Sequence, residues 1–411
     1  MRRTACLSLL TALAVLFCGC GLVGLPGSNV RGCYPYPVAG GSAGPGSEPL
    51  TRFIAMGDFG TAQGGRNRQV AAALEQYLAS TNIHTDRVFE LGDNFYYHGL
   101  IGTGTSCGDL PAPPQAVTDQ ALSVLQPFEF LRDRGITLTA IAGNHDYGCG
   151  GQGLVNQIHV DRWLPPAHRW GRHWEVVAGL PRAILLGNGA VQVIVLDSER
   201  MITDRAFRAR SARVLKELLA QGRRRYRWRI LAAHHPLRTN GVHDGAWWKG
   251  ALPKVSSLLV LPSHALAWLE LPPFSLLNQE VYSIRYAGYR RAVEAAVRQS
   301  GAAVALFLAG HDHQLQLLAP DAVGEPFVLV SGSAAKCSPV RTHQDTLFAA
   351  AKNGFAVITA YPQHLDLDFV GTTGCCDRTA CAPSSDGRPH RLFTYRVPAP
   401  GTPGPGAAAS S

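Results

Sequence analysis

Five short polar clusters in this sequence carry side chains that are able to bind metal ions. They read GDFG, GDN, GNHD, AHHP and GHDH, and they begin at residues 57, 92, 143, 233 and 310. Carboxylate, imidazole and carboxamide groups in one set suit a pair of divalent or trivalent transition ions. A carboxylate that bridges two ions about 3.5–4 Å apart is the usual arrangement for phosphoryl transfer. The clusters therefore predict a two-metal site.

The succession of these clusters is more specific than any one of them. A Gly-Asp pair often only shapes a turn, and a single histidine is more often structural than a ligand. GHDH is the strongest block, since it places two imidazoles in one short turn. Five such clusters, each directly after an apolar run, favour a metal centre over a set of ordinary turns.

The segments that must position the clusters alternate between strand and helix patterns. The apolar runs TRFIAM, RVFEL, ITLTAIA, RWRILA and VALFLA end at the five clusters, VQVIVL predicts a further strand, and NRQVAAALEQYLAS predicts a helix. Strands that alternate with helices predict a layered α/β fold. Open α/β sheets place their sites beyond the carboxyl ends of the strands, which is where each cluster lies.

The bulk composition admits a large domain and gives no sign of a nucleic-acid partner. The chain has 411 residues, of which 46% are hydrophobic and 16% charged, with a net charge of +9. This length is enough for one large core or two ordinary domains. The positive charge fits an anionic substrate or an anionic membrane surface. Because the sequence has no zinc-finger, helix-turn-helix or RNA-binding pattern, we expect no nucleic acid as partner.

The N-terminus has the pattern of an export signal. Two arginines precede the apolar run 7–17, which is shorter than the ~20 residues that a membrane span needs. The letters FCGC at 17–20 resemble a bacterial lipobox, which would make Cys20 the lipidated first residue of the mature protein. Residues 1–20 are thus predicted as a signal peptide of the lipoprotein type, with ordinary secretion as the alternative. The expected location is secreted or in the cell envelope, anchored by lipid to a bacterial membrane.

Composition divides the rest of the chain into a linker, a domain and a tail. Residues 21–50 predict a Gly/Pro/Ser-rich linker, residues 51–395 the folded domain, and residues 396–411 a disordered tail. The segment 245–286 interrupts the alternation of strands and helices with three tryptophans. It predicts an insertion, which is either a buried structural element or a segment that faces the substrate.

The cysteines indicate an oxidising compartment. Export favours disulfide bonds, but the number of cysteines after Cys20 is odd, so one either stays free or pairs outside the chain. Three cysteines close to one another, at 375, 376 and 381, are expected to hold a C-terminal loop together. The connectivity stays open. The seven cysteines are Cys33, Cys107, Cys149, Cys337, Cys375, Cys376 and Cys381.

The five clusters, in this order, resemble the calcineurin-like metallophosphoesterases across about residues 51–395. The resemblance implies a four-layer α/β/β/α sandwich of two mixed β-sheets flanked by helices. Many members begin with GDxH, whose histidine binds the first metal ion, but Gly60 stands at that position here. Tyr96, three residues after Asp93, supplies a replacement. This combination, together with AHHP and GHDHQLQ, is similar to the purple acid phosphatases, particularly the small tartrate-resistant type.

The resemblance implies two metal ions, with Fe(III) in the first position and Fe(II), Zn or Mn in the second. A phenolate is a hard anionic donor that suits a ferric ion, and Fe(III) acidifies bound water strongly. Seven residues match the ligand positions of the family: Asp58, Tyr96 and His313 at the first ion, Asn144, His234 and His311 at the second, and Asp93 as the bridge.

Two further histidines match substrate-side positions of the resembled enzymes. His145 follows Asn144 directly, and His243 lies nine positions after His234. The resemblance implies that His145, with the help of His243, holds the phosphate and protonates the leaving group while a hydroxide held by the ions attacks phosphorus in line. General acid catalysis of this kind contributes ~10²–10⁴-fold to the rate. The substrate is expected to be a small phosphate ester.

Other residues near the motifs are expected to have no direct part in the chemistry. The ring of Phe59 stands where the tartrate-resistant enzymes have tryptophan, and we expect it to pack rather than to bind a ligand. Tyr97, His98 and His235 match no ligand position, so they are predicted to be structural or to lie on the rim of the site.

Three functions remain open at this stage. The leading one is an exported phosphomonoesterase, and the second is a phosphodiesterase or nucleotide-specific hydrolase of the same superfamily. The third is a surface protein that retains metal but binds a partner without turnover. A complete set of ligands and substrate-side histidines disfavours the third, because a binding protein has no chemical need for it.

Overall fold

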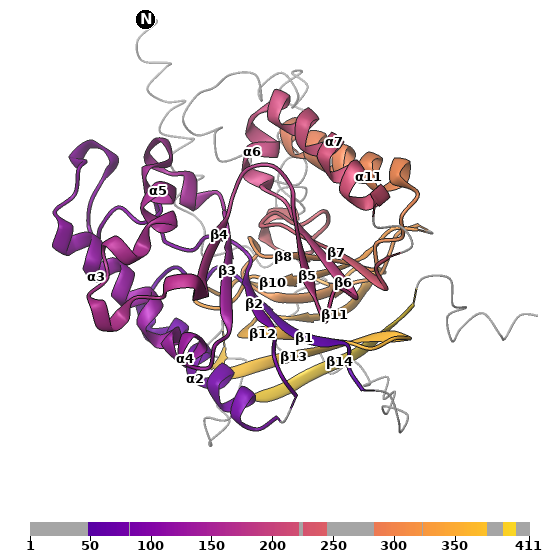
Figure 1. Cartoon of the computed structure of the whole chain (residues 1–411), viewed down its shortest axis with the longest axis horizontal. Helices are drawn as coiled ribbons and strands as arrows, with labels where there is room; N and C mark the ends of the chain where they lie inside the picture. The colour runs from indigo at the N-terminus through magenta and orange to yellow at the C-terminus, as the bar shows by residue number, and fades with distance from the viewer. Residues whose placement is uncertain are drawn as a thin grey trace, which may run out of the picture.

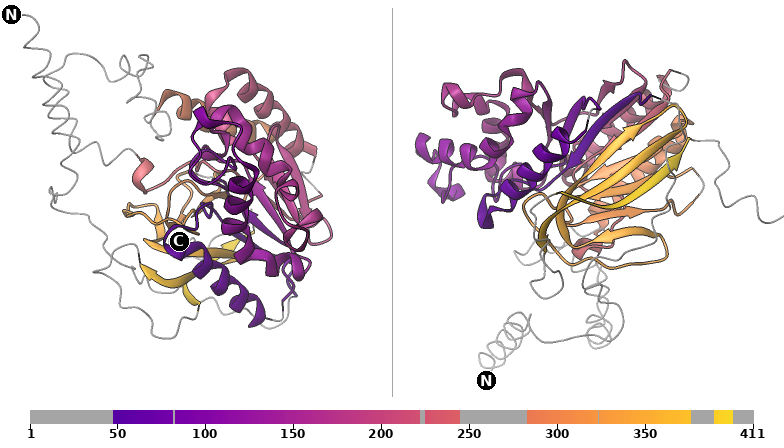
Figure 2. Two further views of the ribbon diagram at one scale, coloured as in Figure 1. Left: turned by 90° about the vertical axis from the view of Figure 1, so that its left-hand side faces the viewer. Right: turned by 90° about the horizontal axis from the view of Figure 1, so that it is seen from below.

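Two seven-stranded β-sheets lie face to face at the centre of the computed structural model, and helices cover both outer faces (Figures 1 and 2). The structure describes residues 48–81, 83–221, 225–244, 283–322, 324–375 and 389–399. The first sheet has the strand order β14-β13-β12-β1-β2-β3-β4, and the second has the order β11-β9-β10-β8-β7-β6-β5.

The first sheet is parallel on one side and antiparallel on the other. Strands β1 to β4 are parallel to one another, whereas β12 runs antiparallel to β1 and continues into the antiparallel strands β13 and β14. Its strands are β1 (Thr51–Met56), β2 (Arg87–Glu90), β3 (Thr137–Ile141), β4 (Trp174–Val177), β12 (Lys352–Ala360), β13 (His364–Cys375) and β14 (His390–Pro398).

The second sheet is also mixed. Strands β6, β7, β8 and β10 are parallel, and β5, β9 and β11 pair antiparallel with their neighbours. Its strands are β5 (Arg182–Leu186), β6 (Val191–Val195), β7 (Trp228–Ala232), β8 (Leu306–Ala309), β9 (Leu315–Leu318), β10 (Phe327–Ser331) and β11 (Thr346–Ala350).

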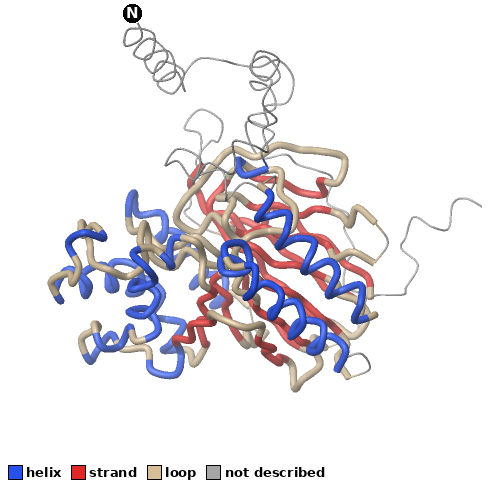
Figure 3. Tube along the Cα trace, turned by 90° about the horizontal axis from the view of Figure 1, so that it is seen from above, coloured by secondary structure: helices blue, strands red, loops and turns tan. Residues whose placement is uncertain are grey.

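The helices fall into two groups, one on each outer face of the sandwich. In Figure 3, α7 and α11 lie across the strands of one sheet, while most other described helices gather away from that face. The helices are α2 (Arg66–Ala79), α3 (Pro114–Leu125), α4 (Glu129–Asp133), α5 (Gln152–Ile158), α6 (Ser198–Thr203), α7 (Arg205–Gln221) and α11 (Ile284–Ser300), with short 3₁₀ turns that include η4 (His145–Tyr147) and η9 (Val242–Asp244).

Three buried apolar layers hold the sandwich together. Phe53 of β1 and Phe348 of β11 belong to the layer between the two sheets. Leu74 of α2 packs in the layer outside the first sheet, and Leu215 of α7 packs in the layer outside the second. A sheet that is buried on both faces has strands that are mostly apolar, and β1, β6 and β7 are buried at every position. The predicted four-layer α/β/β/α sandwich is confirmed.

The end of the folded domain differs from the sequence prediction. Residues 396–399, which the composition places in the disordered tail 396–411, instead complete the sheet. Arg396 in β14 pairs with Asp366 of β13 at 2.8 and 3.0 Å, and the N–H of Ala399 donates to the carbonyl of Gln363. A cross-strand ion pair therefore extends the order beyond the point where the composition changes.

The other predicted boundaries lie mainly outside the described residues. The leader, Cys20 and the linker up to residue 47 are not described, and neither are residues 245–282 of the predicted insertion. Its last residues, 283–286, form the start of α11, where Tyr286 is buried and donates its hydroxyl hydrogen to the carbonyl of Pro236. Within the described ranges, the structure contains no helix that is both long and apolar enough for a membrane span.

Candidate metal centre

The five polar clusters follow five parallel strands directly. GDFG follows β1, GDN follows β2 and GNHD follows β3 in the first sheet, whereas AHHP follows β7 and GHDH follows β8 in the second. The carboxyl ends of these strands meet at one edge of the sandwich, so the side chains of both sheets converge there. The seven predicted ligands and both predicted catalytic histidines are brought together at this edge.

One group of atoms gathers around the phenol oxygen of Tyr96. The hydroxyl donates to Asp58 Oδ1 at 2.8 Å, and it lies 3.3 Å from His313 Nε2. His313 Nε2 is also 3.4 Å from Asp58 Oδ1. A carboxylate oxygen, a phenol oxygen and an imidazole nitrogen thus surround one point, with the hard donors that a trivalent ion prefers.

A second group gathers around His234. Its Nδ1 lies 2.8 Å from the carbonyl oxygen of Leu91, so Nδ1 carries the hydrogen and Nε2 presents a lone pair. Nε2 faces Asn144 Oδ1 at 3.0 Å, His311 Nδ1 at 3.3 Å and Asp93 Oδ1 at 3.4 Å. Electron-rich atoms that converge in this way repel one another unless a positive charge lies between them. The residues present therefore fit a metal ion.

Asp93 and Asp58 connect the two groups. Their carboxylate oxygens and a ring nitrogen of His234 all lie within 4.8 Å of one another. The spacing suits a pair of ions that share a carboxylate, as in two-metal sites. The role of Asp93 as the bridging ligand stays a prediction.

The charges of the buried site favour cations. Burial raises the pKa of Asp93, but His234 and His145 lower it more, and the net pKa is about 2. Burial lowers the pKa of His234, yet Asp93 and Asp58 outweigh it, so the net pKa is raised. Asp93 is therefore ionised at neutral pH. In the metal-free site His234 tends to bind a proton, which supplies the positive charge that a metal ion would otherwise supply.

Tyr96 gives up its phenol proton with difficulty in the metal-free site. Burial, and then the negative charge of Asp58, raise the pKa of Tyr96 well above its ordinary value of 10.0. A cation at the phenol oxygen would offset this cost.

Three candidate ligands have strained backbones. Asp58, Asp93 and His311 have φ values of 63°, 59° and 70°, in the left-handed region that non-glycine residues seldom adopt. Each such residue costs about 1–3 kcal/mol, and such residues cluster at functional sites because the surrounding structure enforces them. The strain lies where the strands end and where the ligands must turn inward.

Two glycines leave room for the ligands. A Cβ on Gly60 would lie 2.4 Å from the carbonyl oxygen of Asp93 and 2.6 Å from the amide nitrogen of Phe95. A Cβ on Gly92, whose φ is 102°, would lie 2.4 Å from His234 Nδ1. The loop that carries Tyr96 therefore packs directly on Gly60, so a histidine at position 60 and this loop exclude each other.

Buried carboxylates that belong to no predicted ligand set support the ligand loops. Glu90 accepts hydrogen bonds from the N–H of Gly92 at 2.7 Å and the N–H of Phe59 at 3.4 Å. Burial and then Asp58 raise the pKa of Glu90 well above its ordinary value. The signal in the sequence was a glutamate between the apolar residues Phe89 and Leu91, which indicates a buried polar role.

Asp146 joins the loops after β2 and β3. One carboxylate oxygen accepts from the N–H of Gly143 at 2.8 Å and of Asn94 at 3.2 Å, and the other accepts from the N–H of Phe95 at 3.2 Å. Gln157 donates to it as well, at 2.8 Å. Burial, and then Asp93, raise the pKa of Asp146 to about 7.

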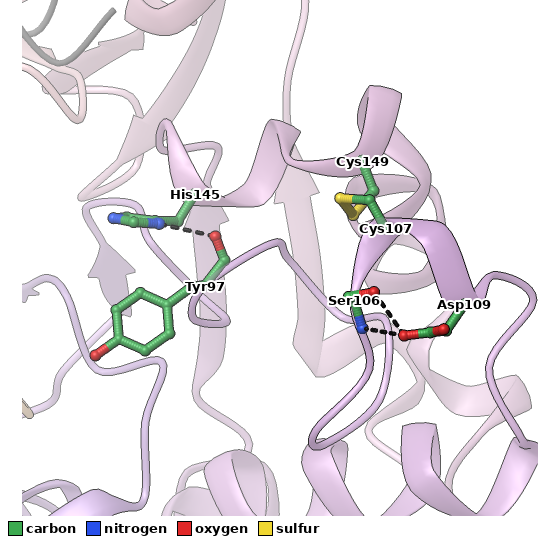
Figure 4. The surroundings of a disulfide bond; sticks show 6 residues. All are labelled: Tyr97, Ser106, Cys107, Asp109, His145 and Cys149. Carbon is green, nitrogen blue, oxygen red and sulfur yellow. Dashed lines mark hydrogen bonds between the residues drawn. A yellow bond between two sulfur atoms is a disulfide. The ribbon is translucent and has the colours of Figure 1, made fainter. Parts of the chain in front are cut away.

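A disulfide bond between Cys107 and Cys149 lies close to the loop after β3, which carries His145 (Figure 4). Cys149 follows η4, whose first residue is His145, and Cys107 belongs to the segment that precedes α3. A further cysteine, Cys337, is also disulfide-bonded. The expected C-terminal cysteine cluster lies outside the described residues, apart from Cys375, which ends β13.

His145 lies beside the second group with one nitrogen available. Its Nδ1 is 2.8 Å from the carbonyl oxygen of Tyr97 and donates to it, as Figure 4 shows. Its Nε2 lies 3.9 Å from Asp93 Oδ2, and 30% of the side chain is exposed. The ring is therefore held in orientation by one nitrogen while the other faces the metal centre and the solvent.

His243 lies against His311, a candidate ligand of the second group. Its ring stacks on His311 with the centroids 4.2 Å apart and an interplanar angle of 28°. The backbone N–H of His243 donates to Asp312 Oδ1 at 3.2 Å, and the hydroxyl of Thr239 also donates to the Asp312 carboxylate. Asp312 thus ties the segment of η9 to the GHDH turn.

The residues that were predicted to be structural or on the rim divide between the two. Tyr97 is 56% exposed and His98 is exposed as well. His235 is fully buried and shares a hydrogen bond of 2.9 Å with the hydroxyl of Ser198. Phe59 packs in the core, with its ring 5.2 Å from that of Phe128, so it contributes no ligand atom.

Lys336 is a charged neighbour that no motif indicated. Its Nζ lies 3.3 Å from the centroid of the Tyr96 ring and 4.6 Å from that of Tyr97. Burial lowers the pKa of Lys336, although Asp93 and Asp58 act in the opposite direction. Lys336 comes from the loop between β10 and β11, outside the five clusters.

The chain belongs to the calcineurin-like phosphoesterase family, whose model matches residues 51–315. It is therefore a metal-dependent phosphoester hydrolase of that family. It is similar to the tartrate-resistant acid phosphatase type 5 of Homo sapiens, with 25% identity over 322 residues that cover 73% of this chain and 77% of that protein.

Solved structures support the same fold. GAP50, the anchor in the inner membrane complex of Plasmodium, superposes with a TM-score of 0.54 at 13% identity and covers 85% of this chain and 89% of its own. The purple acid phosphatase PPD1 from yellow lupin gives a TM-score of 0.50 at 14% identity and covers 84% of this chain and 54% of its own. At these identities the likeness shows the fold.

Proposed function

We propose that this protein is an exported phosphatase that hydrolyses small phosphate monoesters at a dinuclear centre, with Fe(III) at the first position and Fe(II), Zn or Mn at the second. The observation that carries this proposal is the meeting of Tyr96, Asp58 and His313 around one point, beside a second nitrogen- and oxygen-rich group that shares Asp93. The similarity to a tartrate-resistant acid phosphatase supports a phosphate monoester as the substrate.

The two ions, when bound, would supply charge neutralisation for the phosphoryl oxygens and an activated water. The residues of this chain orient the ester and manage its protons. His145 is fixed by the donation of its Nδ1–H to the carbonyl of Tyr97, so its Nε2 could give a hydrogen to the leaving oxygen when the ring is protonated. His243, stacked on His311, would hold the phosphoryl group from the other side of the second position.

Export is supported by two features. The leader has the pattern of a signal peptide with a lipidated Cys20, and the disulfide bond between Cys107 and Cys149 suits an oxidising compartment. We expect Cys20→Ser to move the protein from the membrane fraction to the soluble fraction. An unchanged distribution would refute the lipid anchor.

A phosphate-release assay with the metal-loaded protein tests the activity. We expect release from a small monoester such as phenyl phosphate, faster at acidic than at alkaline pH, and much slower release from the corresponding diester. A faster diester reaction would favour the phosphodiesterase alternative. No turnover of either, with both metals present, would leave a protein that binds a partner without turnover. This last alternative is considered because the structural neighbour GAP50 is described as the anchor in the inner membrane complex of Plasmodium.

A further inference from the structure

We propose that Lys336 binds the substrate, with its ammonium group paired to a phosphoryl oxygen of the ester on the Tyr96 side of the metal centre. This inference rests on the proposed hydrolase function and adds a residue that the resemblance to the family did not supply. The geometry points to it because Nζ lies 3.3 Å above the ring of Tyr96, whose phenol oxygen is itself at the first metal position.

The position of Lys336 is fixed by the backbone on both sides of it. The N–H of Ala334 donates to the carbonyl of Gly57 at 3.0 Å, and the N–H of Ser338 donates to the carbonyl of His313 at 2.8 Å. One anchor is thus the residue before a candidate ligand, and the other is a candidate ligand. A side chain held in this way by rigid neighbours loses less entropy when it binds a substrate.

Two further contacts hold the turn itself. The side chain of Asn353, which is buried at the start of β12, donates to the carbonyls of Ser333 at 2.6 Å and Lys336 at 2.9 Å. The next residue, Cys337, is disulfide-bonded. The loop between β10 and β11 is therefore cross-linked at the point where it presents the ammonium group.

The aromatic rings around the ammonium group hold it without neutralising it. Nζ lies over Tyr96 and over the exposed ring of Tyr97, which is a cation–π arrangement. No carboxylate of the described residues lies within 4 Å of Nζ in an ion pair. The negative charges that raise the pKa of Lys336, against the effect of burial, are those of Asp93 and Asp58.

When metal ions are bound, the ammonium group of Lys336 would need an anion beside it. Asp93 and Asp58 are candidate metal ligands, so the charge that they offer to Lys336 would be taken up by the ions. The ammonium group and the two ions would then repel one another in a partly buried site. A phosphate group relieves this repulsion, since it is an anion that all three cations can share through charge-assisted hydrogen bonds.

The experiment compares the binding of inorganic phosphate to the metal-loaded wild type and to Lys336→Met, Lys336→Arg and Lys216→Met. Methionine keeps the length of the side chain and removes the charge. Lys216 is exposed on α7, outside the second sheet, and its variant is the matched control for the loss of one positive charge. Calorimetry gives the dissociation constant, and metal analysis gives the occupancy.

We expect Lys336→Met to raise the dissociation constant of phosphate about 10- to 100-fold at unchanged metal occupancy, as for the loss of one charged hydrogen bond. Lys336→Arg should stay within about threefold of the wild type, and Lys216→Met should equal it. The KM for a monoester should rise in Lys336→Met by more than kcat falls, because the interaction is already made in the ground state.

Three results would overturn the inference. Unchanged phosphate affinity in Lys336→Met means that the ammonium group does not reach the substrate. A phosphate affinity of Lys336→Arg as low as that of Lys336→Met means that positive charge at this position does not decide the binding of phosphate. Loss of metal from Lys336→Met means that the residue serves the metal centre instead. Failure of the hydrolase proposal is separate, since it appears as phosphate binding without turnover in the wild type.

Discussion

Gly60 and Tyr96 depend on each other at the level of single residues. The backbone of residues 93–95 lies so close to Gly60 that any Cβ there would collide with it. Tyr96 in turn reaches Asp58 and His313, where the family's histidine at position 60 would otherwise bind. The candidate ligand Tyr96 thus lies in the next loop, and the close approach of that loop requires a glycine at position 60.

Tyr96→Phe should remove the colour of the oxidised iron-loaded protein. The variant lacks the phenol oxygen, so the charge-transfer band from tyrosinate to Fe(III) in the visible range should disappear while iron remains measurable. Absorption spectroscopy with iron analysis checks this. Tyr97→Phe is the matched control, because its ring is exposed on the rim, and it should keep the band. A coloured Tyr96→Phe protein would contradict the ligand assignment.

His145→Ala should lower kcat about 10²–10⁴-fold and leave the metal content unchanged. This range is the contribution of a general acid, and Nε2 of His145 is the ring nitrogen left for that role when the ring is protonated. His98→Ala is the control, since His98 is exposed in the neighbouring loop and matches no ligand position. Equal rates for the two variants would show that another group protonates the leaving oxygen.

At the scale of secondary-structure elements, a disulfide bond and a group of ion pairs connect loops and strands. The disulfide bond from Cys107 to Cys149 fastens the segment before α3 to the turn that carries His145. Glu175 of β4 pairs with Arg87 of β2 and with Arg182 of β5. Since β4 and β5 belong to different sheets, this group of charges links the edges of the two sheets.

Loss of the disulfide bond should destabilise the protein substantially. Cys107→Ser opens a loop whose ends are 42 residues apart, and the loop-closure entropy of such a link corresponds to about 4 kcal/mol. Chemical denaturation of the wild type and the variant measures the difference. The metal-loaded variant should also have a higher KM, because His145 is less well oriented. An unchanged unfolding midpoint would show that the link does not constrain the unfolded chain.

Glu175→Gln should lower stability at neutral pH only. Burial raises the pKa of Glu175, but Arg87 and Arg182 outweigh it, so the net pKa lies below the ordinary value of 4.5. A lowered pKa adds stability above pH ~4.5 that is lost as the pH falls through the native pKa. We expect a loss of about 1 kcal/mol at pH 7 and convergence with the wild type at pH values below the native pKa. A constant difference across this range would contradict the ionic explanation.

The metal centre joins the two halves of the whole molecule. Asp58, Asp93 and Asn144 come from the first sheet, whereas His234 and His311 come from the second. Ions that bind ligands from both sheets would hold the sheets together at the edge where the strands end. Binding energy then adds directly to the free energy of unfolding.

Removal of the metals should therefore lower the stability of the entire domain. If the free ion concentration is 1,000 times the dissociation constant, chelation should cost about 4 kcal/mol. Thermal unfolding with and without a chelator measures the change. Asp93→Asn lacks the bridging carboxylate, so the chelator should have much less effect on it. The same midpoint for the wild type in both conditions would show that the centre carries no stabilising ion.

The sequence alone determined the layered fold, the five strand ends and the residues that meet there. These features are local, because a ligand directly after an apolar strand is positioned by the strand that precedes it. Only the tertiary structure decided which contacts support them, among them those of Glu90, Asp146 and Lys336. It also extended the last strand to Pro398, through the pairing of Arg396 with Asp366. Such contacts join residues far apart in the chain, and no period or motif within one segment encodes which partner the fold will bring beside them.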